Sequence, residues 1–179
     1  MKNIITFLLV LAVVATWYLA PQPKKVERKV EIPTDYFIVQ FDRKKMDKAG
    51  KVASTFHADR VDHYPNQNHA EMVQPRAITY TEGNPPWFLR ADHGIQYEET
   101  NRITLSGDVV ANQRYRKSEK FSLIESEMLD LFTDEEYLVT DQPITFSTES
   151  SVTQSIGAKA WMGSGIVQLL KNATGHYQP

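Results

Sequence analysis

The stretch "LRADHGIQYEETNRITLSGDVVAN", residues 89–112, contains two alternations of apolar and polar residues separated by a polar break. In the second alternation, the odd-numbered residues from Ile103 to Ala111 are apolar or glycine, whereas the even-numbered residues include Thr104 and Asp108. Successive side chains of a strand point to opposite faces, so this pattern predicts a strand with one apolar and one wet face and excludes a helix. The break "YEETNR" is typical of a turn, and the stretch is therefore predicted to be a β-hairpin.

This hairpin is one unit of an internal repeat of about 33 residues. A large apolar residue, a spacer and a small residue recur at 56–58, 89–91, 124–126 and 156–158, and a second triplet recurs at 72–74, 105–107, 139–141 and 170–172. Turn-forming residues separate the two halves of each repeat, so each repeat is predicted to be a hairpin. A further hairpin precedes the repeats, with strands at 35–42 and 51–64. The predicted fold class is all-β, an open stack of antiparallel hairpins with inward apolar faces, such as a sandwich or jellyroll.

The N-terminus has a different composition. Residues 4–20 form a continuous apolar run of 17, which predicts a membrane-spanning anchor. A signal peptide cleaved near Ala15 is the alternative. The predicted division is a cytoplasmic stub and anchor at 1–22, a linker at 23–34 and a β-domain at 35–179. The basic residues after the run outnumber Lys2 before it, which by the positive-inside rule favours a cytoplasmic β-domain.

Composition and motifs exclude several classes of function. The net charge of −2 gives no basic footprint for nucleic acid, and the absence of cysteine excludes a disulfide scaffold and a thiolate metal site. His57, His63 and His69 are spaced by six residues, which fits no zinc pattern. Asp59 and Asp62 fall on a wet face, where an acid–base pair is not expected. We therefore predict no metal, no cofactor and no catalysis. The basic loop 112–120 could approach lipid phosphates or be simply solvated.

Small residues recur on the apolar face where a tightly filled core would favour larger ones. They are Ala58, Ala91, Gly107, Ser126 and Ala158. Two interpretations remain open: the small residues leave an apolar furrow, or facing side chains such as Trp87, Trp161, Phe56 and Phe146 fill the space.

Four segments together resemble a known family. They are "GKVASTFHADRVDHY" (50–64), "QP" (74–75), "PPWFLRAD" (85–92) and "ITLSGDVVAN" (103–112), and they are similar to the corresponding segments of LptC, the single-pass lipopolysaccharide-export protein of Gram-negative inner membranes. The resemblance covers nearly the whole chain. It implies a twisted, open antiparallel β-jellyroll in the periplasm, an N-terminus in the cytoplasm and no enzymatic activity.

The resemblance also implies a function. The protein would receive lipopolysaccharide from an ABC exporter of the same membrane (LptB, LptF, LptG) and pass it to the soluble periplasmic protein LptA, for transport to the outer membrane. The acyl chains would lie in the furrow, which strand parity predicts to be lined by Phe56, Ala58, Ile78, Leu89, Ala91, Ile103, Leu105, Val109, Ile124, Met128, Ile144 and Phe146. A membrane-tethered assembly adaptor and a membrane-anchored hydrolase are the alternatives.

Partners are expected at the two ends of the hairpin stack, because unpaired strand edges invite addition of another strand. The resemblance implies that the first strand docks on the exporter and the last hairpin on LptA. The residues predicted at these edges are Phe37, Val39, Phe41 and Gly50 at one end and Trp161, Ile166 and Leu170 at the other. Pro143 stands where the family suggests a functional glycine, and it is interpreted as the cap of an edge.

Overall fold

The computed structural model describes residues 34–97, 99–115 and 119–177. These residues belong to one compact unit, Ile32–Pro179, built of strands and a single 3-10 turn, η1 (Pro65–Gln67). The strands are β1 (Tyr36–Met46), β2 (Val52–Tyr64), β3 (His69–Val73), β4 (Arg76–Thr79), β5 (Trp87–Arg90), β6 (His93–Tyr97), β7 (Arg102–Arg114), β8 (Phe121–Phe132), β9 (Tyr137–Thr148), β10 (Ser151–Trp161) and β11 (Ile166–Tyr177).

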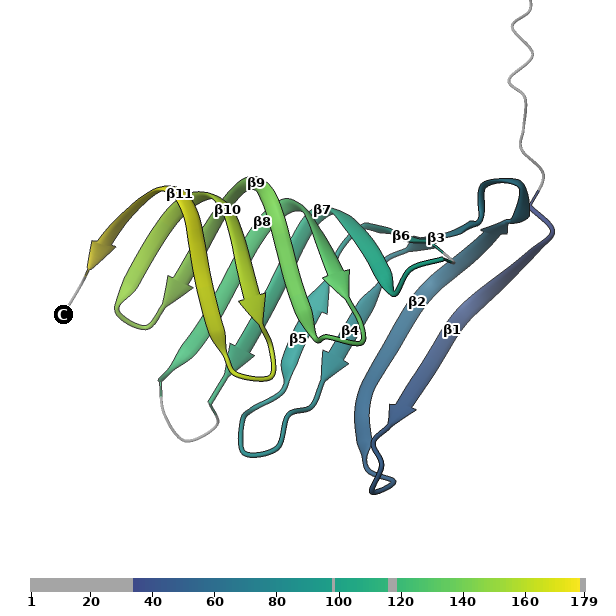
Figure 1. Cartoon of the computed structure of the whole chain (residues 1–179), viewed down its shortest axis with the longest axis horizontal. Helices are drawn as coiled ribbons and strands as arrows, with labels where there is room; N and C mark the ends of the chain where they lie inside the picture. The colour runs from purple at the N-terminus through teal and green to yellow at the C-terminus, as the bar shows by residue number, and fades with distance from the viewer. Residues whose placement is uncertain (1–33, 98, 116–118, 178–179) are drawn as a thin grey trace, which may run out of the picture. The chain divides into compact units, whose positions relative to one another are not determined.

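The strands form one continuous antiparallel sheet that follows chain order from β1 to β11 (Figure 1). β3 and β4 pair one after the other with β2, and β5 and β6 pair in the same way with β7. Each of these two pairs therefore acts as one long strand interrupted in the middle. The predicted all-β, antiparallel hairpin fold is confirmed, and β1 and β11 are its two end strands.

The repeat corresponds to the structure closely. The predicted turns fall between β2 and β3, β6 and β7, β8 and β9, and β10 and β11. One boundary was wrong, because the strand predicted at 35–42 continues to Met46. Lys44 and Lys45 still pair with Thr55 and Ser54 of β2, since charged side chains on an edge strand remain in water while the backbone pairs.

Each long strand bends once, at the positions where the repeat places small or polar residues. Gln74, Gly107 and Asn172, the third residues of three second triplets, have φ angles of 51°, 75° and 51°. The pairing register shifts next to Gly107 in β7 and next to Gly157 in β10, which marks β-bulges. A bulge bends its strand and increases its twist. The bends of neighbouring strands lie side by side, so the sheet folds into two layers whose apolar faces meet.

Buried hydroxyl groups satisfy the backbone at this line of bends. The Ser126 hydroxyl lies 3.0 Å from the carbonyl oxygen of Met128 and 3.2 Å from that of Pro143, and the Thr140 hydroxyl donates to Met128 at 2.6 Å. Ser155 plays the same part in β10, with its hydroxyl 3.1 Å from the carbonyl oxygen of Gly157. A buried carbonyl without a donor is costly, so these hydroxyls stabilise the bends.

This arrangement corrects two expectations. The inward face was expected to be apolar apart from the small residue Ser126, yet Thr140 and Ser155 are buried as well. Pro143 does not cap an edge, because it lies in the central strand β9 opposite the register shift at Ile156. A proline inside a sheet is tolerated at a bulge, where the ladder is already interrupted.

The core lies between the two layers. One row of it crosses the first layer through successive strand pairs and consists of Phe56, Ala77, Leu89, Ala111, Ile124 and Phe146. Trp87 of this layer and Met162, which follows β10 of the second layer, belong to the same buried cluster and are 1% and 3% exposed. Large side chains from one layer therefore fill much of the space left by small residues of the other.

The bend at Gly107 gives a stability prediction. An alanine there would keep φ at +75° and place its Cβ 2.9 Å from Asp92 Cβ. The left-handed penalty of about 1–2 kcal/mol adds to an overpacking cost of about 1–3 kcal/mol, so Gly107→Ala should destabilise by about 3 kcal/mol. Gly83 has a similar φ of +79° but open space around it, and Gly83→Ala should cost only about 1–2 kcal/mol. Urea unfolding of both variants measures the difference, and equal costs would show that Asp92 moves aside freely.

Candidate functional site

The structure brings most of the predicted furrow residues to the space between the layers. Phe56 and Phe146 are half-buried against the core, and the buried residues are Ala58, Leu89, Ala91, Ile103, Leu105, Val109, Ile124 and Ile144. They come from strands on both sides of the bends, so residues distant in sequence share one apolar interior.

Two of the predicted residues face the other way. Ile78 pairs with Thr55 and Phe88, one register position away from the inward Ala77, and it lies with Arg76 and His57 on the outer face. Met128 is 39% exposed, whereas its neighbour Leu129 is buried in the core. The rule that alternate residues face the same side fails at both places, because an interruption of the strand changes which residues face inward. Ile78 follows the break between β3 and β4, and Met128 lies in the bulge of β8.

The interior opens to solvent at a mouth between the second half of β1 and the turn that joins β8 to β9. Its cavity has a volume of about 50 Å³ and is lined on its apolar side by Phe41, Phe56, Ile103, Leu131 and Met162. Ligand pockets of proteins usually measure roughly 300–1,000 Å³. The cavity at this mouth is thus too small for an acyl chain, which could enter there only if the layers separate.

An ion pair crosses this mouth. Lys45 Nζ lies 3.1 Å from Asp134 Oδ1, and the two side chains are 44% and 55% exposed. Asn101 also donates to the Asp134 carboxylate. An exposed pair of this kind contributes roughly 0.2–1 kcal/mol, so it closes the mouth only weakly.

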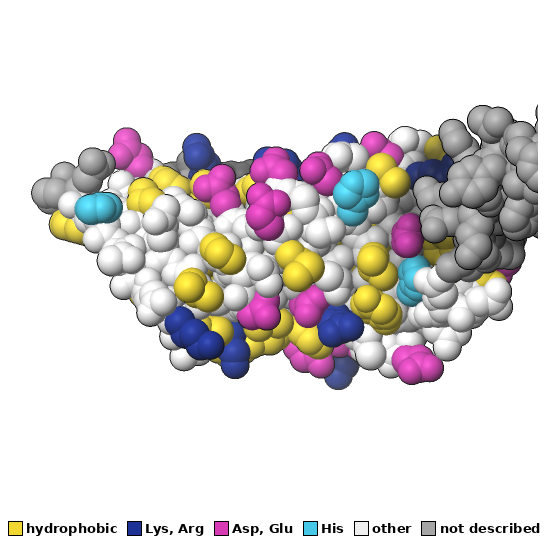
Figure 2. Space-filling view, turned by 90° about the horizontal axis from the view of Figure 1, so that it is seen from above, with side chains coloured by type: hydrophobic (Ala, Val, Ile, Leu, Met, Phe, Trp, Pro, Cys, Tyr) yellow, Lys and Arg dark blue, Asp and Glu magenta, His cyan; other side chains and the backbone are white. Residues whose placement is uncertain are grey.

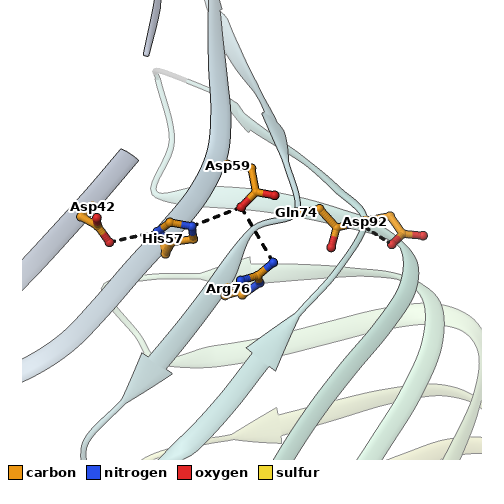
Figure 3. Close-up of polar contacts among 6 residues, drawn as sticks. All are labelled: Asp42, His57, Asp59, Gln74, Arg76 and Asp92. Carbon is orange, nitrogen blue, oxygen red and sulfur yellow. Dashed lines mark hydrogen bonds and ion pairs between the residues drawn. The ribbon is translucent and has the colours of Figure 1, made fainter. Parts of the chain in front are cut away.

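The outer face of β1 and β2 carries a polar network (Figure 3). His57 lies between two carboxylates, with Nδ1 3.0 Å from Asp42 Oδ1 and Nε2 3.2 Å from Asp59 Oδ1. Arg76 of β4 approaches Asp59 at 3.8 Å. The hydrogen bond to Asp42, followed by that to Asp59, raises the pKa of His57 above its usual 6.5. The network ties the end strand β1 to β2 and β4, and nothing in it approaches the apolar interior.

The predicted edge residues differ in exposure: some are open to solvent at the ends of the sheet, and others are not. Phe37 and Val39 on β1 and Ile166 on β11 are each 57% exposed, and Leu170 on β11 is 41% exposed. Phe41, in contrast, packs against the core next to Phe56, with ring centroids 6.3 Å apart.

Gly50 lies in the turn between β1 and β2 with a φ of +77° and no neighbour where its Cβ would be. Trp161 is not on an edge, because β10 pairs with both β9 and β11.

The sequence analysis did not predict an aromatic ladder on the outer face. The Tyr137 ring lies 5.9 Å from that of Phe132 and 5.2 Å from that of Trp161. These residues occupy paired positions at the ends of β8, β9 and β10, where cross-strand aromatic contacts stabilise a sheet. Only Phe132 had a signal in the sequence: it lies eight residues after Ile124, as Tyr64 and Tyr97 lie eight residues after Phe56 and Leu89. Elsewhere, on the face shown in Figure 2, hydrophobic side chains lie in small separate patches among charged ones.

The described residues form neither a cluster of metal ligands nor a membrane-spanning helix. Within 34–97, 99–115 and 119–177, no group of three or more His, Asp or Glu side chains is arranged to hold a metal ion. In the same segments no helix is long and apolar enough to cross a membrane. The predicted anchor, residues 4–20, lies outside the described residues.

Comparison with known proteins identifies the family. The family described as "Lipopolysaccharide-assembly, LptC-related" matches residues 4–178. The chain belongs to the LptC family. It is therefore a component of the lipopolysaccharide transport bridge, and its family is one of transport components rather than enzymes.

A solved structure shares the fold. LptH from Pseudomonas aeruginosa, described as the LptA-homologous periplasmic component of the lipopolysaccharide transport device, superposes with a TM-score of 0.52 at 12% identity, covering 78% of this chain and 96% of LptH. At this identity the likeness shows the fold alone, an LptA-like jellyroll. No curated protein matches the sequence.

The His57 network predicts a pH dependence of stability. A histidine whose pKa is raised by folding stabilises the protein fully below about pH 6.5, and this contribution is lost as the pH rises through the folded value. The melting temperature of the wild type should therefore fall between about pH 6 and pH 8.5, and His57→Gln should reduce that fall.

His93→Gln is the matched control, because His93 is exposed and lies on the separate strand β6. The measurement is a set of thermal melts of all three proteins across this pH range. If His57→Gln and the control kept the same pH dependence as the wild type, the network would not couple protonation to folding.

Proposed function

We propose that this chain carries lipopolysaccharide toward the outer membrane by holding its acyl chains between the two layers of the sheet. It would receive the lipid from the inner-membrane ABC exporter of LptB, LptF and LptG and pass it to soluble LptA. The observation that carries the proposal is an apolar interior that extends from β1 to β10 between two free strand edges. Burial stabilises each CH₂ group by about 0.8 kcal/mol, which offsets the cost of moving acyl chains through water.

The two end strands support docking at both ends of the sheet. Among the described residues β1 pairs only with β2 and β11 only with β10, so within this part of the chain each presents one unpaired backbone edge. A jellyroll of the same fold can add its own end strand to such an edge and continue the sheet. The β1 edge would dock on the exporter and the β11 edge on LptA. This docking would join the apolar interiors of the three proteins end to end.

The membrane anchor belongs to the same proposal. Residues 4–20 would span the inner membrane, residues 23–34 would be a linker, and residues 35–179 would form the periplasmic domain. The chain enters the sheet at Asp35, whose N–H donates to the carbonyl oxygen of His63 at 3.3 Å. A linker of this length reaches at most about 40 Å, which keeps β1 close to the membrane of the exporter.

Photo-crosslinking tests the lipid path with two matched phenylalanines. Phe56 faces the cavity at the mouth, whereas Phe88, 42% exposed, lies on the outer face. A photoreactive phenylalanine analogue at position 56 should form lipopolysaccharide adducts in cells that export the lipid, and the same analogue at position 88 should form none. Equal adducts at both positions would contradict an interior path.

An assembly adaptor is the second candidate, and one observation favours it. The cavity at the mouth has a volume of only about 50 Å³, and Trp87, which does not line it, is fully buried in the core. An adaptor would use both strand edges without separating the layers. Export that continues normally with no adduct at position 56 would support the adaptor over the lipid carrier.

The β11 edge gives a separate prediction. Lysine on an edge strand opposes strand addition, so Ile166→Lys should weaken the binding of purified LptA about tenfold or more. Val152→Lys is the control, because Val152 is 48% exposed but lies on β10, which is paired on both sides. Equilibrium titration of each full-length variant measures the effect. Equal weakening in both variants would indicate a general charge effect instead of edge docking.

A further inference from the structure

Basic residues gather along the second half of β1 and the turn that follows it. Between Asp42 and Lys51 the chain carries five basic residues, Arg43, Lys44, Lys45, Lys48 and Lys51, against the two acidic residues Asp42 and Asp47. This strip borders the mouth of the apolar interior. A positive strip beside an apolar opening is complementary to an anionic amphiphile.

Two of these side chains face the mouth. Arg43 pairs with Phe56 and Lys45 with Ser54, and all four residues line the cavity. Lys44 pairs with Thr55 and does not line the cavity; it lines a depression on the opposite face with His57 and Ile78, which Arg43 and Phe56 also border. The alternation of the strand thus separates two cations that border the interior from one that does not.

Of the two basic side chains that line the mouth, Arg43 has no acidic partner among the described residues and Lys45 has one. In the described part of the chain Arg43 makes no ion pair, whereas Lys45 is paired with Asp134. The opposite layer also presents Glu136 and Gln96 to the cavity. The Glu136 carboxylate lies toward the turn between β10 and β11, where it would be 3.6 Å from a Cβ on Gly163. The anionic groups of the mouth therefore do not neutralise Arg43.

We propose that Arg43 and Lys45 bind a phosphate group of the transported lipid while its acyl chains enter the cavity beside Phe56. This inference rests on the proposed function and names the part of the ligand that the mouth recognises. The guanidinium of Arg43 can hold two phosphate oxygens at once, and the ammonium of Lys45 adds a second positive charge two residues along the strand.

Phosphate binding would also open the mouth. When the phosphate attracts Lys45, the ion pair between Lys45 and Asp134 is replaced, and the contact that joins β1 to the turn after β8 is lost. Because that pair is exposed, its replacement costs little. Recognition of the headgroup and separation of the layers are thus one event at one site.

The test compares two lipids that differ only in charge. Full-length protein in neutral detergent is titrated with radiolabelled lipid A carrying its phosphates and with the same lipid after enzymatic dephosphorylation. The double variant Arg43→Gln/Lys45→Gln should bind the phosphorylated lipid about tenfold more weakly or worse and the dephosphorylated lipid within about twofold of wild type. Lys44→Gln, the control on the opposite face, should bind both lipids like the wild type.

Asp134→Asn tests the exchange in the other direction. It leaves Lys45 unpaired and removes the weak closing contact, so the phosphorylated lipid should bind about threefold more tightly, whereas the dephosphorylated lipid, which gains only from the looser mouth, should gain clearly less. Circular dichroism of every variant confirms that the sheet is intact.

Each other outcome overturns a defined part of the inference. Equal binding of both lipids by the wild type would leave the furrow as a lipid site and remove the phosphate site. An equal loss of both lipids in the double variant would reduce Arg43 and Lys45 to a packing role. Inorganic phosphate that competes at the same concentration as the lipid would indicate a free-anion site. Binding of neither lipid by the wild type would overturn the proposed function itself, and the phosphate site with it.

Discussion

Every long strand of this sheet must bend once without leaving a buried carbonyl group unpaired. The bulges next to Gly107 and Gly157 provide the bend, and the hydroxyls of Ser126, Thr140 and Ser155 provide donors where the ladder is interrupted. Bulges on neighbouring strands lie side by side, so their bends add up to one fold line across the sheet. Without that line the structure would be a single twisted sheet with an apolar face in water.

The two layers and the two free edges follow from this one constraint. A bend in each strand turns the apolar face inward on itself, so the interior forms without closing the sheet into a barrel. Because the sheet does not close, β1 and β11 retain unpaired edges. A closed barrel would remove both edges and with them any means of continuing the sheet into a neighbouring protein.

The sequence predicted the hairpins because turn residues and strict alternation are local signals. Leu105 and Ile103 were placed correctly, since β7 is regular on that side of its bulge. Ile78 and Met128 were misplaced because parity is counted along the chain and a break or bulge resets it. The small residues were interpreted either as leaving a furrow or as spaces filled by facing side chains, but Ser126 is small so that its hydroxyl reaches two carbonyls. Lys45 and Asp134 lie 89 residues apart in the sequence, so no local pattern could predict their contact.

The layers are not held together equally along their length. The largest fully buried side chains, Trp87, Leu105 and Val109, are not among the residues that line the mouth cavity, and separating the layers around them would expose apolar surface to water. At the mouth beside β1 the two layers are joined by the exposed ion pair between Lys45 and Asp134, which contributes much less. The layers therefore part most easily at the β1 end, the edge proposed to face the exporter. In the proposed function, lipid would enter at this end and move along the apolar interior, which continues through the core cluster toward β10.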